Sequence, residues 1–114
     1  MNAINHEISK ATENKQQTVL IIEDDQSLLT LITRNCWRSG YHILQAESGC
    51  RGIELALENP DALILLDYAL PDMSGDELLH RLKELDIQPR FVVMTGRGDE
   101  RLAVQMMKLG AMDY

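Results

Sequence analysis

The stretch VLIIEDD, residues 19–25, is a short apolar run that ends in three acids. The pattern recurs in LILLD at residues 63–67, and a third run, FVVMT at residues 91–95, ends in a hydroxyl group. Apolar runs of this length predict buried strands. The carboxyl ends of parallel strands line one edge of an open sheet, and ligands bind there. We therefore expect the polar groups that end these runs to meet at one edge: Glu23, Asp24, Asp67 and Thr95.

Helical patterns fill the spaces between the apolar runs. Strands are expected at about 18–22, 41–46, 62–66 and 90–94, with a fifth just starting at 111–114. Helices are expected at about 26–39, after Ser48, after Ser74 and at about 99–109, with Gly40 ending the first. Strands that alternate with helices in this way predict right-handed βαβ units and a parallel sheet.

The apolar spacing also predicts which face of each helix is buried. For the first helix the expected stripe is Leu28, Leu31, Ile32 and Cys36, with Trp37 packed at its edge. For the second helix it is Ile53, Ala56 and Leu57, and for the third it is Leu78, Leu79, Leu82 and Leu85.

Length and charge limit the classes of function. The 114 residues suffice for one domain. An excess of 18 acidic over 11 basic side chains disfavours direct binding of nucleic acid and suits cations. The polar opening segment, residues 1–17, is expected to be a flexible tail and has no apolar stretch typical of a signal peptide. No apolar run approaches the roughly 20 residues that cross a bilayer, so we expect no membrane association and a cytoplasmic location.

The acids at the sheet edge predict metal-assisted chemistry. Carboxylates that lie together repel one another unless a cation sits between them, and hard oxygen ligands suit Mg²⁺. Asp67, at the end of a central strand, is the best candidate for a nucleophile toward phosphorus, while Asp24 would hold the metal and Thr95 would donate to a phosphoryl oxygen. An alternative for residues 23–25 alone is acidic decoration of a helix N-terminus.

Four stretches in this order resemble the receiver domain of two-component response regulators. They are VLIIEDD at 19–25, DYALPDMSG at 67–75, VMTG at 93–96 and KLGAMDY at 108–114. The resemblance covers roughly residues 18–114. It implies a flavodoxin-like, doubly wound parallel sheet of five strands in the order 2-1-3-4-5.

The resemblance also implies roles for individual residues. Asp67 would be the phosphoacceptor, and Glu23 and Asp24 the acidic pair. The Mg²⁺ site would consist of these three carboxylates and the main-chain carbonyl of Ala69. Thr95 would sense the phosphoryl group and Tyr114 would swing inward with it. The phosphoryl donor would be a phosphohistidine on a sensor histidine kinase or a histidine phosphotransfer domain.

One departure from the family concerns the C-terminal end. Receivers carry a lysine a few positions after the aromatic residue, and this chain ends before that position; Lys108 belongs to the fourth helix. The last strand would be incomplete and the final helix absent, so we expect a C-terminally truncated receiver at 18–114, the front part of a longer regulator or hybrid kinase. Apolar surface left bare by the missing helix would favour a homodimer, exchange of elements or lower stability.

Other functions remain open at this stage. One alternative is a degenerate receiver that binds partners without being phosphorylated. A less favoured one is an Asp-nucleophile phosphatase, which would need a second aspartate where Ala69 stands; we expect no enzyme beyond self-phosphorylation and autodephosphorylation. Dinucleotide binding is disfavoured because acids replace the required glycine-rich loop after the first strand.

Overall fold

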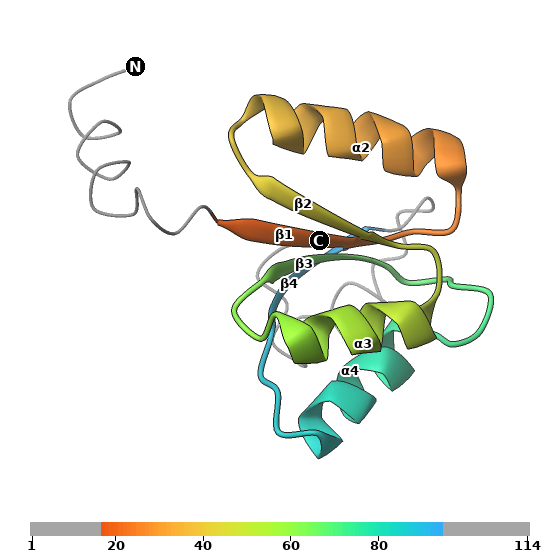
Figure 1. Cartoon of the computed structure of the whole chain (residues 1–114). Helices are drawn as coiled ribbons and strands as arrows, with labels where there is room; N and C mark the ends of the chain where they lie inside the picture. The colour runs from red at the N-terminus through yellow and green to blue at the C-terminus, as the bar shows by residue number, and fades with distance from the viewer. Residues whose placement is uncertain (1–16, 95–114) are drawn as a thin grey trace.

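The computed structural model describes residues 17–94 of the chain (Figure 1). Within that range, strands and helices alternate as the sequence predicts. The elements are β1 (Thr18–Ile22), α2 (Gln26–Arg38), β2 (His42–Ala46), α3 (Gly49–Glu58), β3 (Leu63–Asp67), α4 (Gly75–Glu84) and β4 (Arg90–Met94).

The strands form a single parallel sheet in the order β2-β1-β3-β4. The change of direction along the sheet lies between β1 and β3, because the chain first winds outward to β2 and then returns past β1. In open α/β sheets such a switch point is where ligands bind, beyond the carboxyl ends of the strands. The predicted doubly wound sheet is confirmed for these strands, whereas the predicted fifth strand and fourth helix lie outside the described residues.

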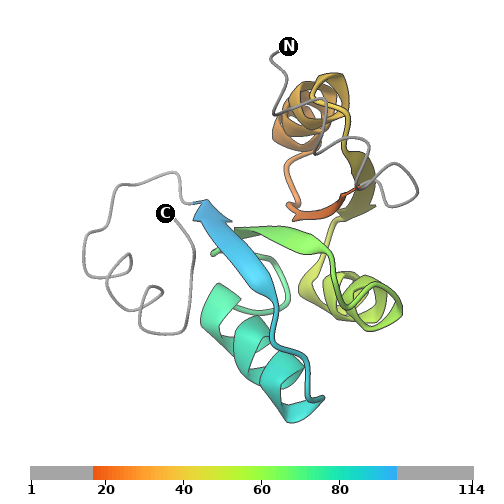
Figure 2. The same cartoon turned by 90° about the vertical axis from the view of Figure 1, so that its left-hand side faces the viewer.

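Helices cover both faces of the sheet. Helix α2 lies on one face, and α3 and α4 lie together on the other (Figures 1 and 2). Strand β1 is apolar from Val19 to Ile22 for this reason. Val19 and Ile21 pack with Leu29 of α2, whereas Leu20 and Ile22 belong to the larger cluster beneath α3 and α4. A strand covered on both sides has no solvent-facing positions, so its sequence shows no polar alternation.

The buried stripe of α2 differs from the predicted one. Leu29 is only 2% exposed, whereas Leu28 is 39% and Leu31 54% exposed. Ile32 and Cys36 pack against the sheet as predicted. The stripe therefore runs through positions 29, 32 and 36, which follow the same helical spacing in a different phase. Trp37 is also not packed at the edge, because it is 69% exposed.

Two further predictions of burial were wrong. In α3 the inward residue is Leu55 and not Leu57, because Gly52, Leu55 and Ala56 share the face against the sheet. In α4, Leu78, Leu79 and Leu82 are buried as predicted, but Leu85 caps the C-terminus and is 47% exposed. Leu85 lies past the last turn, where a side chain no longer faces the sheet.

The helix ends follow local sequence signals. Ser48 and Ser74 are the N-caps of α3 and α4, and their side chains accept hydrogen bonds from the amides of Arg51 and Glu77. Gly40, after α2, adopts φ of +88°, a conformation that favours glycine. Among the helices at residues 17–94, none combines the length and the apolar character that spanning a membrane requires.

Candidate metal and phosphoacceptor site

The register of the sheet brings the acids of β1 and β3 to the same level. Ile22 pairs with Leu66, so the next residues, Glu23 and Asp67, extend side by side from adjacent strands. The Glu23 amide still donates to the Ala46 carbonyl of β2 at 2.9 Å, which holds the backbone of Glu23 in line with the sheet. The position of the acids thus follows from parallel pairing alone.

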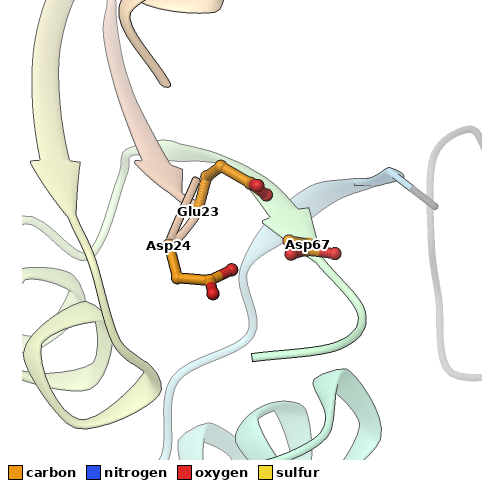
Figure 3. Close-up of side chains that lie close together, drawn as sticks. All are labelled: Glu23, Asp24 and Asp67. Carbon is orange, nitrogen blue, oxygen red and sulfur yellow. The ribbon is translucent and has the colours of Figure 1, made fainter. Parts of the chain in front are cut away.

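Three carboxylates converge at this edge. One oxygen each from Glu23, Asp24 and Asp67 lies within 4.8 Å of the others. Figure 3 shows the side chains of Glu23 and Asp24 directed toward Asp67 from the end of β1. Their environments differ, because Glu23 is buried, Asp67 is half-buried and Asp24 is exposed. The site therefore has a closed side and an open side, and the open side admits a ligand from solvent.

Burial of Glu23 makes it the most perturbed group of the cluster. Its side chain is only 3% exposed, and removal from water is the largest cause that raises the pKa of its carboxyl group to about 7. A hydrogen bond to Asp67 and the negative charges of Asp67 and Asp24 raise this pKa further, while the Asp25 amide opposes them. The carboxyl group of Glu23 therefore holds its proton to a higher pH than an exposed glutamate does.

The acids at positions 23–25 have separate tasks. Asp25 is the N-cap of α2, because its Oδ1 accepts hydrogen bonds from the amides of Ser27 at 3.0 Å and Leu28 at 3.2 Å. The alternative of a decorated helix N-terminus therefore holds for Asp25 only. Glu23 and Asp24 face Asp67 and are available for other chemistry.

The loop after β3 touches the carboxylate of Asp67. The Ala69 amide donates to Asp67 Oδ1 at 3.2 Å, and Ala69 forms an isolated bridge with Ser74 across the loop. At the base of the loop the Gly75 amide donates to the Tyr68 carbonyl at 2.8 Å. The resemblance to receiver domains implied a role for the main-chain carbonyl of Ala69, which stays a prediction. The contact of the Ala69 amide was missed, because short loop sequences do not specify which amide faces a side chain.

The donor set fits a hard divalent cation. Carboxylate oxygens are the ligands that Mg²⁺ prefers, and a cation would offset the repulsion that raises the pKa of Glu23. Glu23, Asp24 and Asp67 are brought together as the sequence predicts. Thr95 and Tyr114 lie outside the described residues, so their predicted roles stay predictions.

Comparison with known proteins identifies the family of this chain. The model of the response regulator receiver domain matches residues 19–114. The phosphate regulon transcriptional regulatory protein PhoB of Pseudomonas aeruginosa is 34% identical over 86% of this chain and 44% of its own length. The sporulation initiation phosphotransferase F of Bacillus subtilis is 29% identical over 86% of this chain and 79% of its own length. The chain thus spans less than half the length of PhoB.

Solved structures agree with the family match. A response regulator receiver domain protein from Clostridium thermocellum superposes with a TM-score of 0.78 at 28% identity, over 86% of this chain and 79% of that one. A CheY-like receiver domain protein from Methanospirillum hungatei gives a TM-score of 0.75 at 29% identity, over 88% and 80%.

Receiver domains typically bind Mg²⁺ at an acidic cluster, interact with histidine kinases or phosphotransfer proteins, and are generally not true enzymes. The acidic cluster of this chain, its parallel sheet and its relatives lead to the same conclusion. The chain belongs to the response regulator receiver domains of two-component systems.

Proposed function

We propose that this chain is a phosphoacceptor module that takes a phosphoryl group onto Asp67 from a phosphohistidine. The observation that carries the proposal is the convergence of Glu23, Asp24 and Asp67 oxygens within 4.8 Å at the switch point of the sheet. The donor would be a sensor histidine kinase or a histidine phosphotransfer domain, and the location the cytoplasm.

The transfer is a displacement at phosphorus. An oxygen of the Asp67 carboxylate attacks, the bond between phosphorus and the histidine nitrogen breaks, and the nitrogen leaves with the electron pair. Mg²⁺, when bound, would neutralise charge on the transferred group. Glu23, Asp24, Asp67 and the carbonyl of Ala69 would hold the ion. The product is an acyl phosphate, which the same module would lose by hydrolysis, without turnover of external substrates.

Two residues beyond β4 complete the proposal. The Thr95 hydroxyl would donate to a phosphoryl oxygen, since it follows β4 directly and β4 pairs with β3 up to Met94 and Asp67. Tyr114 would move inward on phosphorylation and report the state of the site.

A homodimer is also proposed, and light scattering of the phosphorylated and unphosphorylated chain tests it. A monomer in both states would contradict it.

Incubation with acetyl phosphate and Mg²⁺, followed by intact mass measurement, tests the function. We expect the wild type to gain one phosphoryl group that hydroxylamine removes, as for an acyl phosphate. Asp67→Asn should gain none. Asp61→Asn is the matched control, because Asp61 precedes β3 and lies at the opposite end of that strand. Equal labelling of the wild type and Asp67→Asn would place the acceptor elsewhere, and an unlabelled wild type would favour a degenerate receiver.

A further inference from the structure

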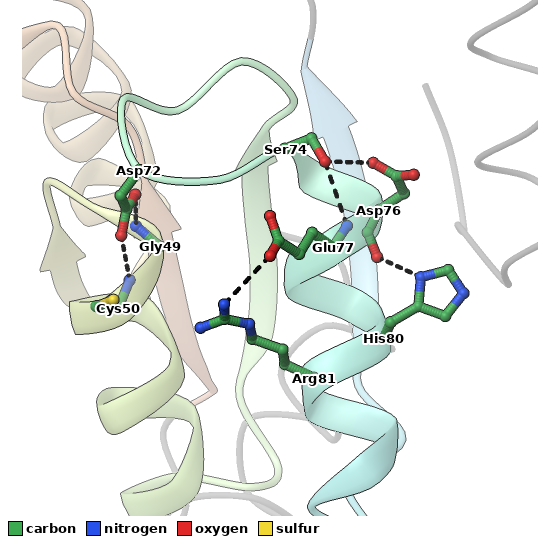
Figure 4. A network of polar contacts seen from close by, with 8 residues as sticks. All are labelled: Gly49, Cys50, Asp72, Ser74, Asp76, Glu77, His80 and Arg81. Atoms are coloured by element: carbon green, nitrogen blue, oxygen red, sulfur yellow. Dashed lines mark hydrogen bonds and ion pairs between the residues drawn. The ribbon is translucent and has the colours of Figure 1, made fainter.

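The loop between β3 and α4 is attached to a second helix through one carboxylate. Asp72 Oδ1 accepts a hydrogen bond from the Gly49 amide at 2.8 Å, and Oδ2 accepts one from the Cys50 amide at 2.9 Å (Figure 4). Gly49 and Cys50 are the first residues of α3, where backbone amides have no partner within the helix. These two bonds join segments that lie 22 and 23 residues apart in the chain.

The titration of Asp72 agrees with this geometry. The amides of Gly49 and then Cys50 are the main causes that lower the pKa of the Asp72 carboxyl group to about 2. The carboxylate is therefore ionised throughout the neutral range, and both of its hydrogen bonds are charge-assisted, which makes them stronger than neutral ones.

A packing contact supports the same attachment. Met73, next to Asp72, is buried against α3, and a Cβ atom at Gly49 would come within 2.5 Å of Met73 Cγ. The loop is also closed at its base by the bond from the Gly75 amide to the Tyr68 carbonyl. The segment from Tyr68 to Ser74 is thus fixed at both its base and its tip.

This fixed loop reaches the phosphoacceptor. Ala69 lies between the base and the tip, and its amide donates to Asp67 Oδ1 at 3.2 Å. The chain of contacts therefore runs from the N-terminus of α3 through Asp72 and the loop to the carboxylate of Asp67. A carboxylate held by a fixed amide keeps one orientation, and such supporting contacts around a site affect how well it binds a metal.

We propose that Asp72 is a positioning residue, which holds the loop against α3 so that Ala69 orients Asp67 and presents its carbonyl to the cation. The proposal rests on the proposed function of Asp67. The polar contacts of Ser74, Asp76 and His80 join the C-terminal end of the loop to α4, so they do not replace the attachment to α3 (Figure 4).

A matched pair of variants separates positioning from mere stabilisation of α3. Asp72→Ala removes the attachment, whereas Ser48→Ala removes the other cap of the same helix, the bond from the Arg51 amide, without touching the loop. Both variants should lose stability, since both leave amides of the first turn without a side-chain partner. Asp72→Asn should be intermediate, because one amide oxygen cannot replace two carboxylate oxygens.

The first readout needs neither metal nor phosphoryl donor. Hydrogen exchange of the Ala69 and Gly75 amides in the metal-free chain should become faster in Asp72→Ala, and less so in Asp72→Asn. In Ser48→Ala these amides should exchange as in the wild type. Equal exchange in Asp72→Ala and Ser48→Ala would overturn the proposal.

The second readout is the Mg²⁺ concentration that half-saturates labelling by acetyl phosphate. It should rise about tenfold in Asp72→Ala, as is typical when a supporting contact of a metal site is lost, while the rate at saturating Mg²⁺ recovers. It should stay unchanged in Ser48→Ala; equal values in both variants would overturn the proposal. Should Asp72→Ala not fold, Asp72→Asn serves in the same comparison. Failure of the wild type to label would refute the proposed function alone, because hydrogen exchange still decides whether Asp72 holds the loop.

Discussion

Replacement of Glu23 by glutamine should stabilise the metal-free protein, although it alters the proposed metal site. Glu23 is buried beside Asp67, and its pKa rises from an ordinary 4.5 to about 7 in the folded chain. Between these values the folded state binds more protons than the unfolded state, so stability falls as pH rises. A glutamine has the shape of the protonated acid and can donate to Asp67 in the same way.

The size of the effect follows from the shift in pKa. A difference of one pKa unit corresponds to about 1.4 kcal/mol, so the shift of Glu23 amounts to about 3 kcal/mol of stability that is lost by pH 8. Glu23→Gln should regain up to about 3 kcal/mol at pH 8. At pH 5 it should regain less than about 1 kcal/mol, because the wild-type carboxyl group is still protonated in the folded state and pH 5 lies only slightly above its pKa in the unfolded state.

Urea unfolding at pH 5 and pH 8 in the presence of a chelator measures both values. Glu54→Gln is the control, since it removes an exposed acid whose pair with Arg51 lies on the surface of α3, and it should change stability little at either pH. Addition of Mg²⁺ at pH 8 should stabilise the wild type more than Glu23→Gln, because only the wild type has the third carboxylate. An equal gain at pH 5 and pH 8, or no gain at pH 8, would refute the reasoning.

Three further predictions concern packing and titration. Leu29→Ala should lower the free energy of unfolding in urea by about 2–4 kcal/mol because Leu29 is buried against the sheet, while Leu31→Ala should lower it by less than about 1 kcal/mol. Equal losses in the two variants would favour the buried stripe predicted from the sequence. Gly52→Ala should lower the free energy of unfolding by about 1–2 kcal/mol in calorimetry, because the added Cβ would come within 2.5 Å of Ile22 Cδ1 and this overpacking outweighs the better helix propensity of alanine. A higher free energy of unfolding in Gly52→Ala would contradict this packing. The stability advantage of the wild type over Asp72→Asn should disappear as pH falls from about 4 to about 2, because the Asp72 carboxylate, whose pKa is lowered, stabilises the fold only while it is ionised. A constant difference in melting temperature across this range would argue against this.

The alternation of strands and helices and the location of the acids could be predicted from local sequence patterns. Apolar runs end at Glu23 and Asp67, and parallel pairing then places both at one edge of the sheet. Ser48 and Ser74 were predicted as N-caps and act as such, because a capping side chain bonds an amide only three residues away. Capping signals act over only three residues, so they can be recognised without knowledge of the rest of the fold.

The resemblance of four ordered stretches to receiver domains was confirmed by the family match at residues 19–114. It implied the order of the strands, which alternation alone leaves open, and the described strands follow that order. Long ordered motifs imply the strand order because they identify a family and therefore its fold. Apolar periodicity indicates only which residues can be buried.

Which of the possible helix faces is buried, and which acids interact, depends on how the elements pack together. In α2, stripes through Leu31 and through Leu29 both fit a helical period, and the position of the sheet selects Leu29. The raised pKa of Glu23 and the attachment of Asp72 to α3 likewise depend on partners that lie 20 or more residues away in the chain. Burial and hydrogen bonding between distant segments arise only when the elements pack, so no local pattern in the sequence specifies them.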